Sequence, residues 1–175
     1  KELGATWGRY KDVDGDGIPW RTLPGTGMPG YFTRGSGHNE MAQYTERQDD
    51  YTRNLDRISR KFDTAKTIVP APVLEAEAGA KVGIIAFGSS HWAVEEARDQ
   101  LREEAGLETS YLRLRAYPFA GAVHDFIRQY DRVYVVEQNR DGQMMSLLRM
   151  DGEPAVATKL RSVLHYNGLP IDARS

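Results

Sequence analysis

This chain of 175 residues lacks three features, and each absence removes a class of function. It has no cysteine, so it cannot form a disulfide, use a thiol nucleophile or bind an iron–sulfur cluster through thiolates. It has no large excess of one charge, with 23 basic and 25 acidic residues, so neither nucleic acid nor an anionic membrane is expected as a partner. It also lacks an apolar run of the roughly 18 residues that cross a bilayer.

These absences predict a soluble, cytoplasmic chain whose redox centre, if the protein uses one, lies in another chain or domain. The first residues, Lys1–Gly4, have no signal-peptide character and begin within what looks like running globular sequence. We therefore expect a fragment or a processed piece of a longer protein. At this length it should still bury roughly 70% of the surface that it would expose unfolded.

The first part of the chain predicts irregular backbone followed by one helix. Residues 1–45 are rich in glycine, proline and threonine and have no sustained period. Residues 67–80, with Pro70 and Pro72, predict a linker and a domain boundary. Between them, residues 46–66 carry apolar side chains at spacings of three and four, which predicts an amphipathic helix with one apolar stripe: Tyr51, Leu55, Ile58, Phe62 and Ala65.

From residue 81 onward, strand patterns and helix patterns alternate. The first helix should be capped at its start by Gly88–Ser90 and stopped by Gly106. Repeated strand–helix units predict a three-layer α/β domain over 81–175, with a mainly parallel sheet and helices on both faces. The strands are expected at four stretches: 81–87, 109–114, 133–136 and 159–165.

Asp12–Gly17 has the spacing of the start of a calcium loop, with oxygen ligands at the first, third and fifth positions and a glycine at the sixth. The rest of the loop does not fit this motif. Pro19 stands at the eighth position, and Leu23 stands at the twelfth, where a bidentate glutamate belongs. A solvated Asp/Gly turn is the other interpretation, and we predict no metal site.

Gly88–His91 lies where a strand leads into a helix, so its backbone amides can bind a phosphate or simply begin the helix. The dinucleotide fingerprint G-x-G-x-x-G is absent, which favours a plain helix start. His91, His124 and His165 stand apart from other candidate groups, and we interpret them as ordinary surface or helix residues.

Thr33–Glu40 is a candidate active-site loop, because two glycines let the backbone turn tightly while Arg34, His38 and Glu40 converge. An arginine can clamp a carboxylate with two hydrogen bonds, and a histidine can move protons near neutral pH. We predict that these three side chains lie near a cofactor or substrate. A loop that only packs two subunits together explains the same residues equally well.

Val133–Val136 has the pattern of a buried strand, and it runs directly into amides and charges. These groups fall at the carboxyl end of the strand, where open α/β sheets bind their ligands. Because such groups are costly to bury unpaired, we predict that a partner subunit satisfies four of them: Glu137, Gln138, Asn139 and Gln143. No catalytic residue can be assigned from spacing, and a binding or assembly module fits these patterns as well as an enzyme does.

Several segments, in the same order along nearly the whole chain, are similar to one known family: Lys11–Thr26, Arg34–Glu40, Asn54–Lys61, Ala86–Ser89, Leu112–Phe119 and Val136–Gln143. Together they resemble the C-terminal portion of the alpha subunit of the 2-oxoacid:ferredoxin oxidoreductases, above all the 2-oxoglutarate enzymes. The chain departs from the family at Asn39, since the family commonly has His-Asp-Glu at this loop.

The resemblance implies that residues 1–66 end a thiamine-pyrimidine-binding domain and that residues 81–175 form a domain of the transketolase C-terminal type. It implies an enzyme that oxidatively decarboxylates 2-oxoglutarate to succinyl-CoA and passes the electrons to ferredoxin. Such enzymes use thiamine diphosphate, magnesium and an iron–sulfur cluster. The diphosphate-binding domain and the cluster would belong to a beta subunit, which agrees with the absence of cysteine here.

The family's catalytic residues lie upstream of this segment, so we expect the isolated chain to bind no cofactor and to be inactive. Its role would be mainly structural, within the complete enzyme. The alternative is a non-catalytic ligand-binding or assembly domain of another thiamine enzyme, such as a 2-oxoacid dehydrogenase or a transketolase relative.

Overall fold

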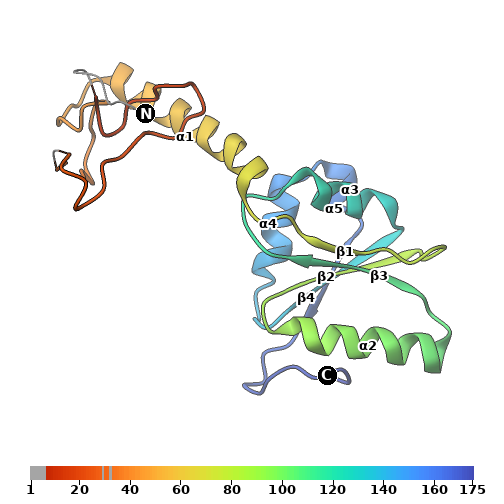
Figure 1. Ribbon diagram of the computed structural model, residues 1–175. Helices are drawn as coiled ribbons and strands as arrows, with labels where there is room; N and C mark the ends of the chain where they lie inside the picture. The colour runs from red at the N-terminus through yellow and green to blue at the C-terminus, as the bar shows by residue number, and fades with distance from the viewer. Residues whose placement is uncertain (1–6, 29, 32) are drawn as a thin grey trace. The chain divides into compact units, whose positions relative to one another are not determined.

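The chain forms two compact units, Lys1–Ile68 and Val69–Ser175. Figure 1 shows the computed structural model, which describes residues 7–28, 30–31 and 33–175. What the sequence predicts for residues 1–6, Pro29 and Phe32 therefore lies outside the described residues. Within the described ranges, no helix is long and apolar enough to cross a membrane.

The first unit is irregular backbone followed by one long helix, α1 (Gln48–Ile68). Both were predicted, although α1 starts two residues later than the pattern indicated and continues to Ile68. The first turn contains Asp49 and Asp50 and the last turn contains Lys66, which are the charges that the helix dipole favours at each end. Before α1, the described residues contain one isolated bridge, between His38 and Tyr44.

The helix α1 turns its polar face toward its own unit and its apolar stripe outward. Tyr51 and Leu55 are 63% and 48% exposed, whereas Asp50 and Arg57 are only 9% exposed. An amphipathic surface helix usually packs the other way round. The sequence pattern therefore located the helix correctly but did not indicate which side of it packs.

The Asp12–Gly17 loop lies directly on the backbone of α1. Arg57 Nη1 donates to the Gly17 carbonyl at 3.0 Å, and Thr64 Oγ1 donates to the Asp16 carbonyl at 2.6 Å. Gly17 has φ of +79°, and a Cβ placed on it would lie 2.3 Å from the Lys61 nitrogen. Only glycine permits both this backbone conformation and this close approach.

The second unit is a five-stranded sheet with the order β1-β3-β2-β4-β5. Neighbouring strands are parallel except at the β1 edge, where β1 pairs antiparallel with β3. The predicted strands are all present, each within about two residues of its expected ends. The strands are β1 (Val73–Glu75), β2 (Val82–Phe87), β3 (Thr109–Leu114), β4 (Arg132–Glu137) and β5 (Leu160–Leu164).

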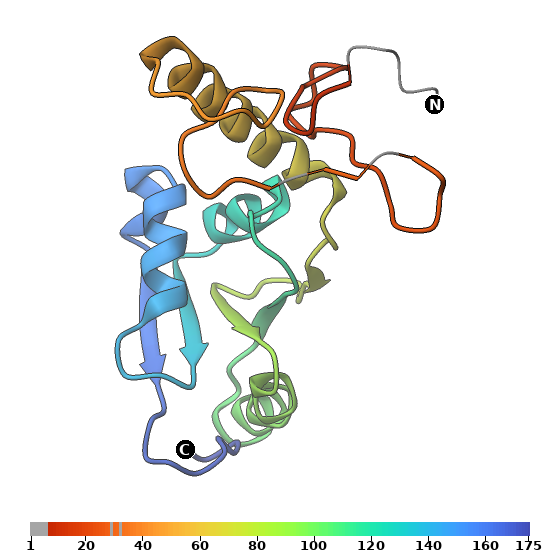
Figure 2. The same cartoon turned by 90° about the vertical axis from the view of Figure 1, so that its left-hand side faces the viewer.

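Helices cover both faces of this sheet, which confirms the predicted three-layer, mainly parallel α/β fold. Figure 1 shows α2 below the sheet and the other helices of the unit above it, and Figure 2 shows α2 almost end-on. Gly106, with φ of +60°, ends α2 as predicted. The helices are α2 (Ser90–Ala105), α3 (Gly121–Gln129), α4 (Gln143–Asp151) and α5 (Pro154–Ala157).

The stretch predicted as a linker, 67–80, contains regular structure and requires a correction. Its first residues belong to α1, and Val73–Glu75 forms the edge strand β1, in which Leu74 lies opposite Leu112. The strand is only three residues long and directly follows Pro72, so it has no alternation to recognise. Proline is tolerated beside an edge strand, because an edge residue need not donate to a second neighbour.

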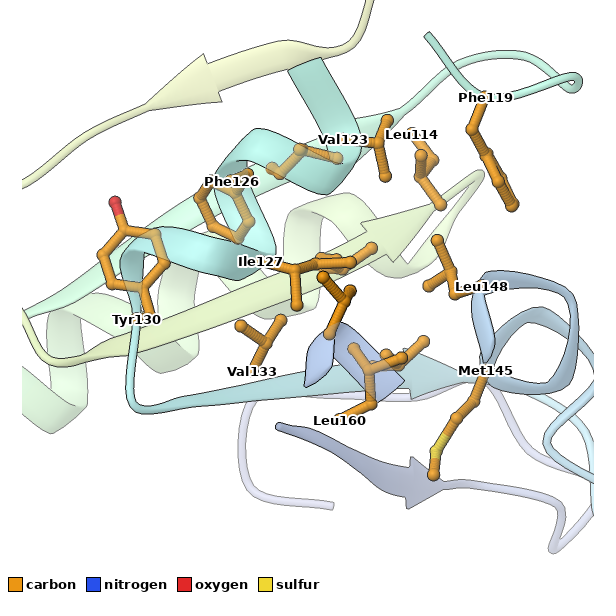
Figure 3. Packing of buried hydrophobic residues seen from close by; sticks show 14 residues of the cluster. Leu114, Phe119, Val123, Phe126, Ile127, Tyr130, Val133, Met145, Leu148 and Leu160 are labelled. Carbon is orange, nitrogen blue, oxygen red and sulfur yellow. The ribbon is translucent and has the colours of Figure 1, made fainter. Parts of the chain in front are cut away.

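Two clusters of buried apolar side chains form the core, one on each face of the sheet. The larger cluster joins β2, β3, β4 and β5 to α3, α4 and α5, and Figure 3 shows its packing. Ile127, Val133, Leu148 and Leu160 are fully buried there. The smaller cluster lies between the sheet and α2 and includes Val94. The predicted core is therefore present on both faces.

All three histidines interpreted as isolated have specific partners, although His91 and His124 do lie in helices. His91 is 7% exposed, and its Nδ1 lies 3.2 Å from the Tyr111 hydroxyl while its Nε2 lies 3.4 Å from the Glu95 carboxylate. Burial raises the pKa of Tyr111 to about 12, so the hydroxyl keeps its proton. His124 Nε2 lies 2.9 Å from Asp151 Oδ2.

Candidate functional site

A polar cleft of about 440 Å³ lies in the first unit, between the loops and α1. His38 and Glu40 reach it from the predicted loop, and Asn54 reaches it from α1. Its charged lining contains more carboxylates than guanidinium groups: Asp12, Glu40, Asp50 and Asp56 against Arg53, Arg57 and Arg60. The cleft is therefore poorly suited to a multiply charged anion.

His38 has a defined tautomer in this cleft. Its Nδ1 lies 2.9 Å from the Ser36 carbonyl oxygen, which can only accept, so Nδ1 carries the proton. In the neutral ring Nε2 is then the acceptor, and it faces the Asn54 side-chain amide at 3.4 Å. The Tyr10 ring lies against the imidazole, with 4.0 Å between the ring centroids.

A second hydrogen bond fixes the orientation of Asn54. Arg57 Nη2 donates to Asn54 Oδ1 at 2.8 Å. Because a guanidinium only donates, this bond places the Asn54 oxygen toward Arg57 and its NH₂ group toward His38. Burial lowers the pKa of Arg57 from its ordinary value, although the nearby Asp12 opposes that change. The chain of bonds from Arg57 to Ser36 therefore presents His38 Nε2 as a proton acceptor.

Asn39 gives the His38 loop its shape through bonds within the loop itself. Its Oδ1 accepts from the backbone nitrogens of Met41 and Gln43 at 3.0 and 3.1 Å. Gly37 approaches the opposite side of the loop so closely that a Cβ would lie 2.6 Å from the Thr45 carbonyl oxygen. The loop is thus shaped by its own backbone contacts.

The structure brings together two of the three residues predicted for this loop. His38 and Glu40 line the same cleft, but Arg34 is exposed and is not part of its lining. The Arg34 Nε donates to the Ala42 carbonyl at 3.2 Å, which holds the side chain against the loop. The predicted convergence of three side chains was therefore wrong for Arg34. A position near a cofactor or substrate stays a prediction for all three.

Sequence reasoning missed the contribution of α1 to the cleft. Asp50, Asn54 and Arg57 recur at spacings of four and three along the helix. That spacing places them on one face, which was the available signal. It was overlooked because the apolar stripe of an amphipathic helix is normally the face that packs.

The Asp12, Asp14 and Asp16 carboxylates each offer an oxygen within 4.8 Å of the others. All three already accept hydrogen bonds, Asp14 from Trp20 Nε1. Asp12 accepts from the Gly15 and Gly17 nitrogens and from Arg60 Nη2, and Asp16 accepts from the Ile18 nitrogen at 2.7 Å. These bonds are those of an Asp/Gly turn anchored to α1.

Calcium is expected to leave the melting temperature of the chain unchanged, because the loop has no closing carboxylate and its oxygens are already used. Differential scanning calorimetry with added calcium tests this. Trp20 fluorescence gives a second measurement, since Trp20 Nε1 donates to Asp14 Oδ2 at 3.3 Å. A saturable rise in melting temperature that is absent in Asp14→Ala would contradict the prediction.

A second crevice, of about 400 Å³, lies at the carboxyl ends of β2 and β4. The chain leaves β2 toward α2 on one face of the sheet and leaves β4 toward α4 on the other. Such a point, where connections diverge, is where open α/β sheets place their ligands. Ser90, Gln138 and Gln143 are among its lining residues. The sequence correctly placed the polar cluster at this edge.

Glu137 finds its partners within the chain, which corrects the argument for a partner subunit. The side chain is fully buried and accepts from the backbone nitrogens of Met144 and Met145 at 2.7 and 3.0 Å. Asn139 Nδ2 donates to it at 2.8 Å, and Asn139 Oδ1 accepts from the Gly142 nitrogen at 2.8 Å. Glu137 and Asn139 therefore stabilise the start of α4.

Gln138 is also satisfied internally. Its Nε2 donates to Ser89 Oγ at 3.2 Å and to Ser90 Oγ at 3.0 Å. Ser89 occupies the N-cap position of α2 but makes no side-chain capping bond, so its predicted role as a cap was wrong. Gln143 is exposed. A subunit contact at this crevice stays a prediction, and it no longer rests on unpaired groups.

No protein-family model matches the chain. A curated protein of Aeropyrum pernix, the alpha subunit of 2-oxoacid:ferredoxin oxidoreductase 2, is 30% identical over an alignment of 177 residues. This alignment covers 95% of the chain and 26% of that protein. The chain is similar to part of this alpha subunit. It spans about a quarter of the relative's length.

A solved structure supports the same similarity. It is 2-oxoglutarate:ferredoxin oxidoreductase from Magnetococcus marinus, with 2-oxoglutarate, coenzyme A and succinyl-CoA bound. The match has a TM-score of 0.80 and 25% identity, and it covers 97% of this chain and 29% of that one. The resemblance seen in the sequence is confirmed.

Proposed function

We propose that the chain is a segment of the alpha subunit of a 2-oxoacid:ferredoxin oxidoreductase that converts 2-oxoglutarate to succinyl-CoA and reduces ferredoxin. The identity of 30% over 95% of the chain carries this proposal. The 2-oxoglutarate in the similar solved structure supports the choice of substrate. Because the segment spans about a quarter of its curated relative, it would act within the complete enzyme, together with a beta subunit.

The cofactors expected for this family do not fit the segment taken alone. An iron–sulfur cluster needs thiolates, and the chain has none. The cleft beside His38 presents carboxylates in excess, which would repel the diphosphate of thiamine diphosphate. We infer that thiamine diphosphate, magnesium and the cluster are held by other parts of the enzyme.

His38 is the residue of this segment that we assign to the chemistry. Its Nδ1 proton is held by the Ser36 carbonyl, which leaves Nε2 able to take up a proton from the cleft. The imidazole is held by stacking on Tyr10, so the position of Nε2 is fixed before a substrate arrives. Our proposal is that His38 accepts and returns a proton in the complete enzyme.

His38→Ala is expected to lower turnover of the assembled enzyme by roughly a hundredfold, the usual contribution of a general acid–base group. The matched variant His38→Asn keeps a donor for the Ser36 carbonyl but has no basic nitrogen, so it should be equally slow and more stable. Turnover is measured at saturating beta subunit, and stability by thermal melting of the 175-residue chain. If each variant loses stability and turnover in proportion, the loop is structural and the assignment fails.

The crevice at the end of β4 is the proposed contact with the beta subunit. Gln143 is exposed there, at the start of α4. Glu137, Gln138 and Asn139 would act indirectly, by holding α4 and α2 in place around it.

A further inference from the structure

The segment formed by residues 165–175 runs from the end of β5 to α2 and is anchored at both ends. At its start, the His165 nitrogen donates to the Glu137 carbonyl at 2.9 Å. Near its end, Ile171 packs against the smaller core cluster and its nitrogen donates to Gln138 Oε1 at 3.4 Å. Arg174 donates through both terminal nitrogens to the Glu104 carboxylate on α2.

Between these anchors lies an exposed turn with an unusual sequence. Asn167 and Gly168 form the one Asn-Gly pair in the chain. Asn167 Oδ1 accepts from the Leu169 nitrogen at 2.9 Å, so the carboxamide is folded back over the backbone that follows it. Gly168 has φ of +88°, and a Cβ placed on it would meet nothing within 4 Å. The turn is therefore open to solvent on the side where a side chain at residue 168 would lie.

The other three asparagines precede larger residues and are held by more than one bond. Asn39 precedes Glu40, Asn54 precedes Leu55, and Asn139 precedes Arg140. In each, both the oxygen and the nitrogen of the carboxamide have partners.

We propose that Asn167 is a site of spontaneous deamidation. The Gly168 nitrogen attacks the Asn167 Cγ, which forms a five-membered imide as the bond from Cγ to the side-chain nitrogen breaks. The proton from the Gly168 nitrogen leaves with that group as ammonia. Water then opens the imide to aspartate or isoaspartate, and nothing is oxidised or reduced. Glycine favours the attack because it has no Cβ to shield its nitrogen.

The isoaspartate product changes the segment more than the aspartate does. Aspartate adds one negative charge, whereas isoaspartate also inserts a methylene group into the main chain. Because His165 and Ile171 are anchored on either side of the turn, we expect the longer chain to pull on these anchors, and the Ile171 bond, at 3.4 Å, is the longer of the two. Displacing Ile171 removes its bond to Gln138, which lines the crevice at the end of β4. Deamidation would therefore loosen one side of that crevice.

Peptide mapping by mass spectrometry, after incubation of the chain at mildly alkaline pH, tests the site. Asn167 should convert roughly tenfold faster than Asn39, Asn54 and Asn139, because only Asn167 is followed by glycine. The three slower asparagines are internal controls in the same sample, and Asn167→Gln should remove the fast release of ammonia. Equal rates at all four asparagines, or an unmodified Asn167, would overturn the proposal.

Hydrogen exchange of the incubated chain tests the consequence. Amides of residues 165–175 should exchange faster in the incubated wild-type chain than in Asn167→Gln treated in the same way. The variant Asn167→Asp carries the charge without the longer main chain, so it should stay close to the untreated protein. If incubated wild type and Asn167→Gln exchange equally while isoaspartate is present, the segment is not loosened and that part of the inference fails.

Discussion

Glu137→Ala is expected to lower the free energy of unfolding of the second unit by about 3–5 kcal/mol. The carboxylate is fully buried at the end of β4 and accepts three hydrogen bonds, two of them from the first turn of α4. Alanine would leave the Met144 and Met145 nitrogens without an acceptor and would leave a cavity. Urea denaturation followed by circular dichroism measures the loss.

Gln143→Ala is the matched control for this substitution. Gln143 lies in the same turn but is exposed, so its removal should change the free energy of unfolding by about 0.5 kcal/mol or less. Glu137→Gln should lose an amount of unfolding free energy between those of Glu137→Ala and Gln143→Ala. It keeps one oxygen acceptor but turns an NH₂ group toward a backbone donor. Equal midpoints for Glu137→Ala and Gln143→Ala would mean that the carboxylate does not hold α4.

Gly17→Ala should destabilise the first unit by about 2–4 kcal/mol. The new Cβ would lie 2.3 Å from the Lys61 nitrogen and 2.7 Å from the Arg57 carbonyl oxygen, and both atoms belong to the backbone of α1. Neither can rotate away, so the loop must move off the helix. The bond from Arg57 to the Gly17 carbonyl would then be lost.

Gly15→Ala separates backbone strain from the collision. Gly15 has nearly the same φ, +81°, but a Cβ there would meet nothing within 4 Å, so only the left-handed conformation costs energy, about 1–2 kcal/mol. Fluorescence in a Trp92→Phe background reports on the first unit, since Trp7 and Trp20 are the remaining tryptophans. Equal losses of unfolding free energy in Gly17→Ala and Gly15→Ala would show that the close approach of Gly17 to α1 does not affect stability.

The sequence predicted helices and strands well where a continuous segment carries a clear hydrophobic pattern over several residues. Strands such as Val133–Val136, apolar on both faces, were recognisable, and so was the stop at Gly106. Strand β1 was missed because three residues beside a proline carry no period. The packing side of α1 was missed because nothing in the helix alone shows that loops will cover its polar face.

The candidate sites were predicted less completely, because they depend on contacts between distant residues. Asn54 meets His38 across 16 positions of sequence, so no local spacing could indicate the pair. Glu137 was recognised as a costly group to bury, but its donors come from the next helix rather than from another chain. The sequence also could not indicate that the Arg34 side chain turns back to the Ala42 carbonyl and does not line the cleft with His38 and Glu40.

The polar contact between α1 and its loops has a thermodynamic consequence. Among residues 7–28, 30–31 and 33–68, no apolar side chain is fully buried, and α1 meets the loops through groups such as Arg57 and Arg60. Unfolding this unit exposes little new apolar surface, so its heat-capacity change is small and its stability varies gently with temperature. The second unit has two apolar cores and a strongly curved stability profile. Added salt should therefore lower the stability of the first unit, because salt screens its charged contacts. Cooling should lower the stability of the second unit, because hydrophobic stabilisation weakens on cooling.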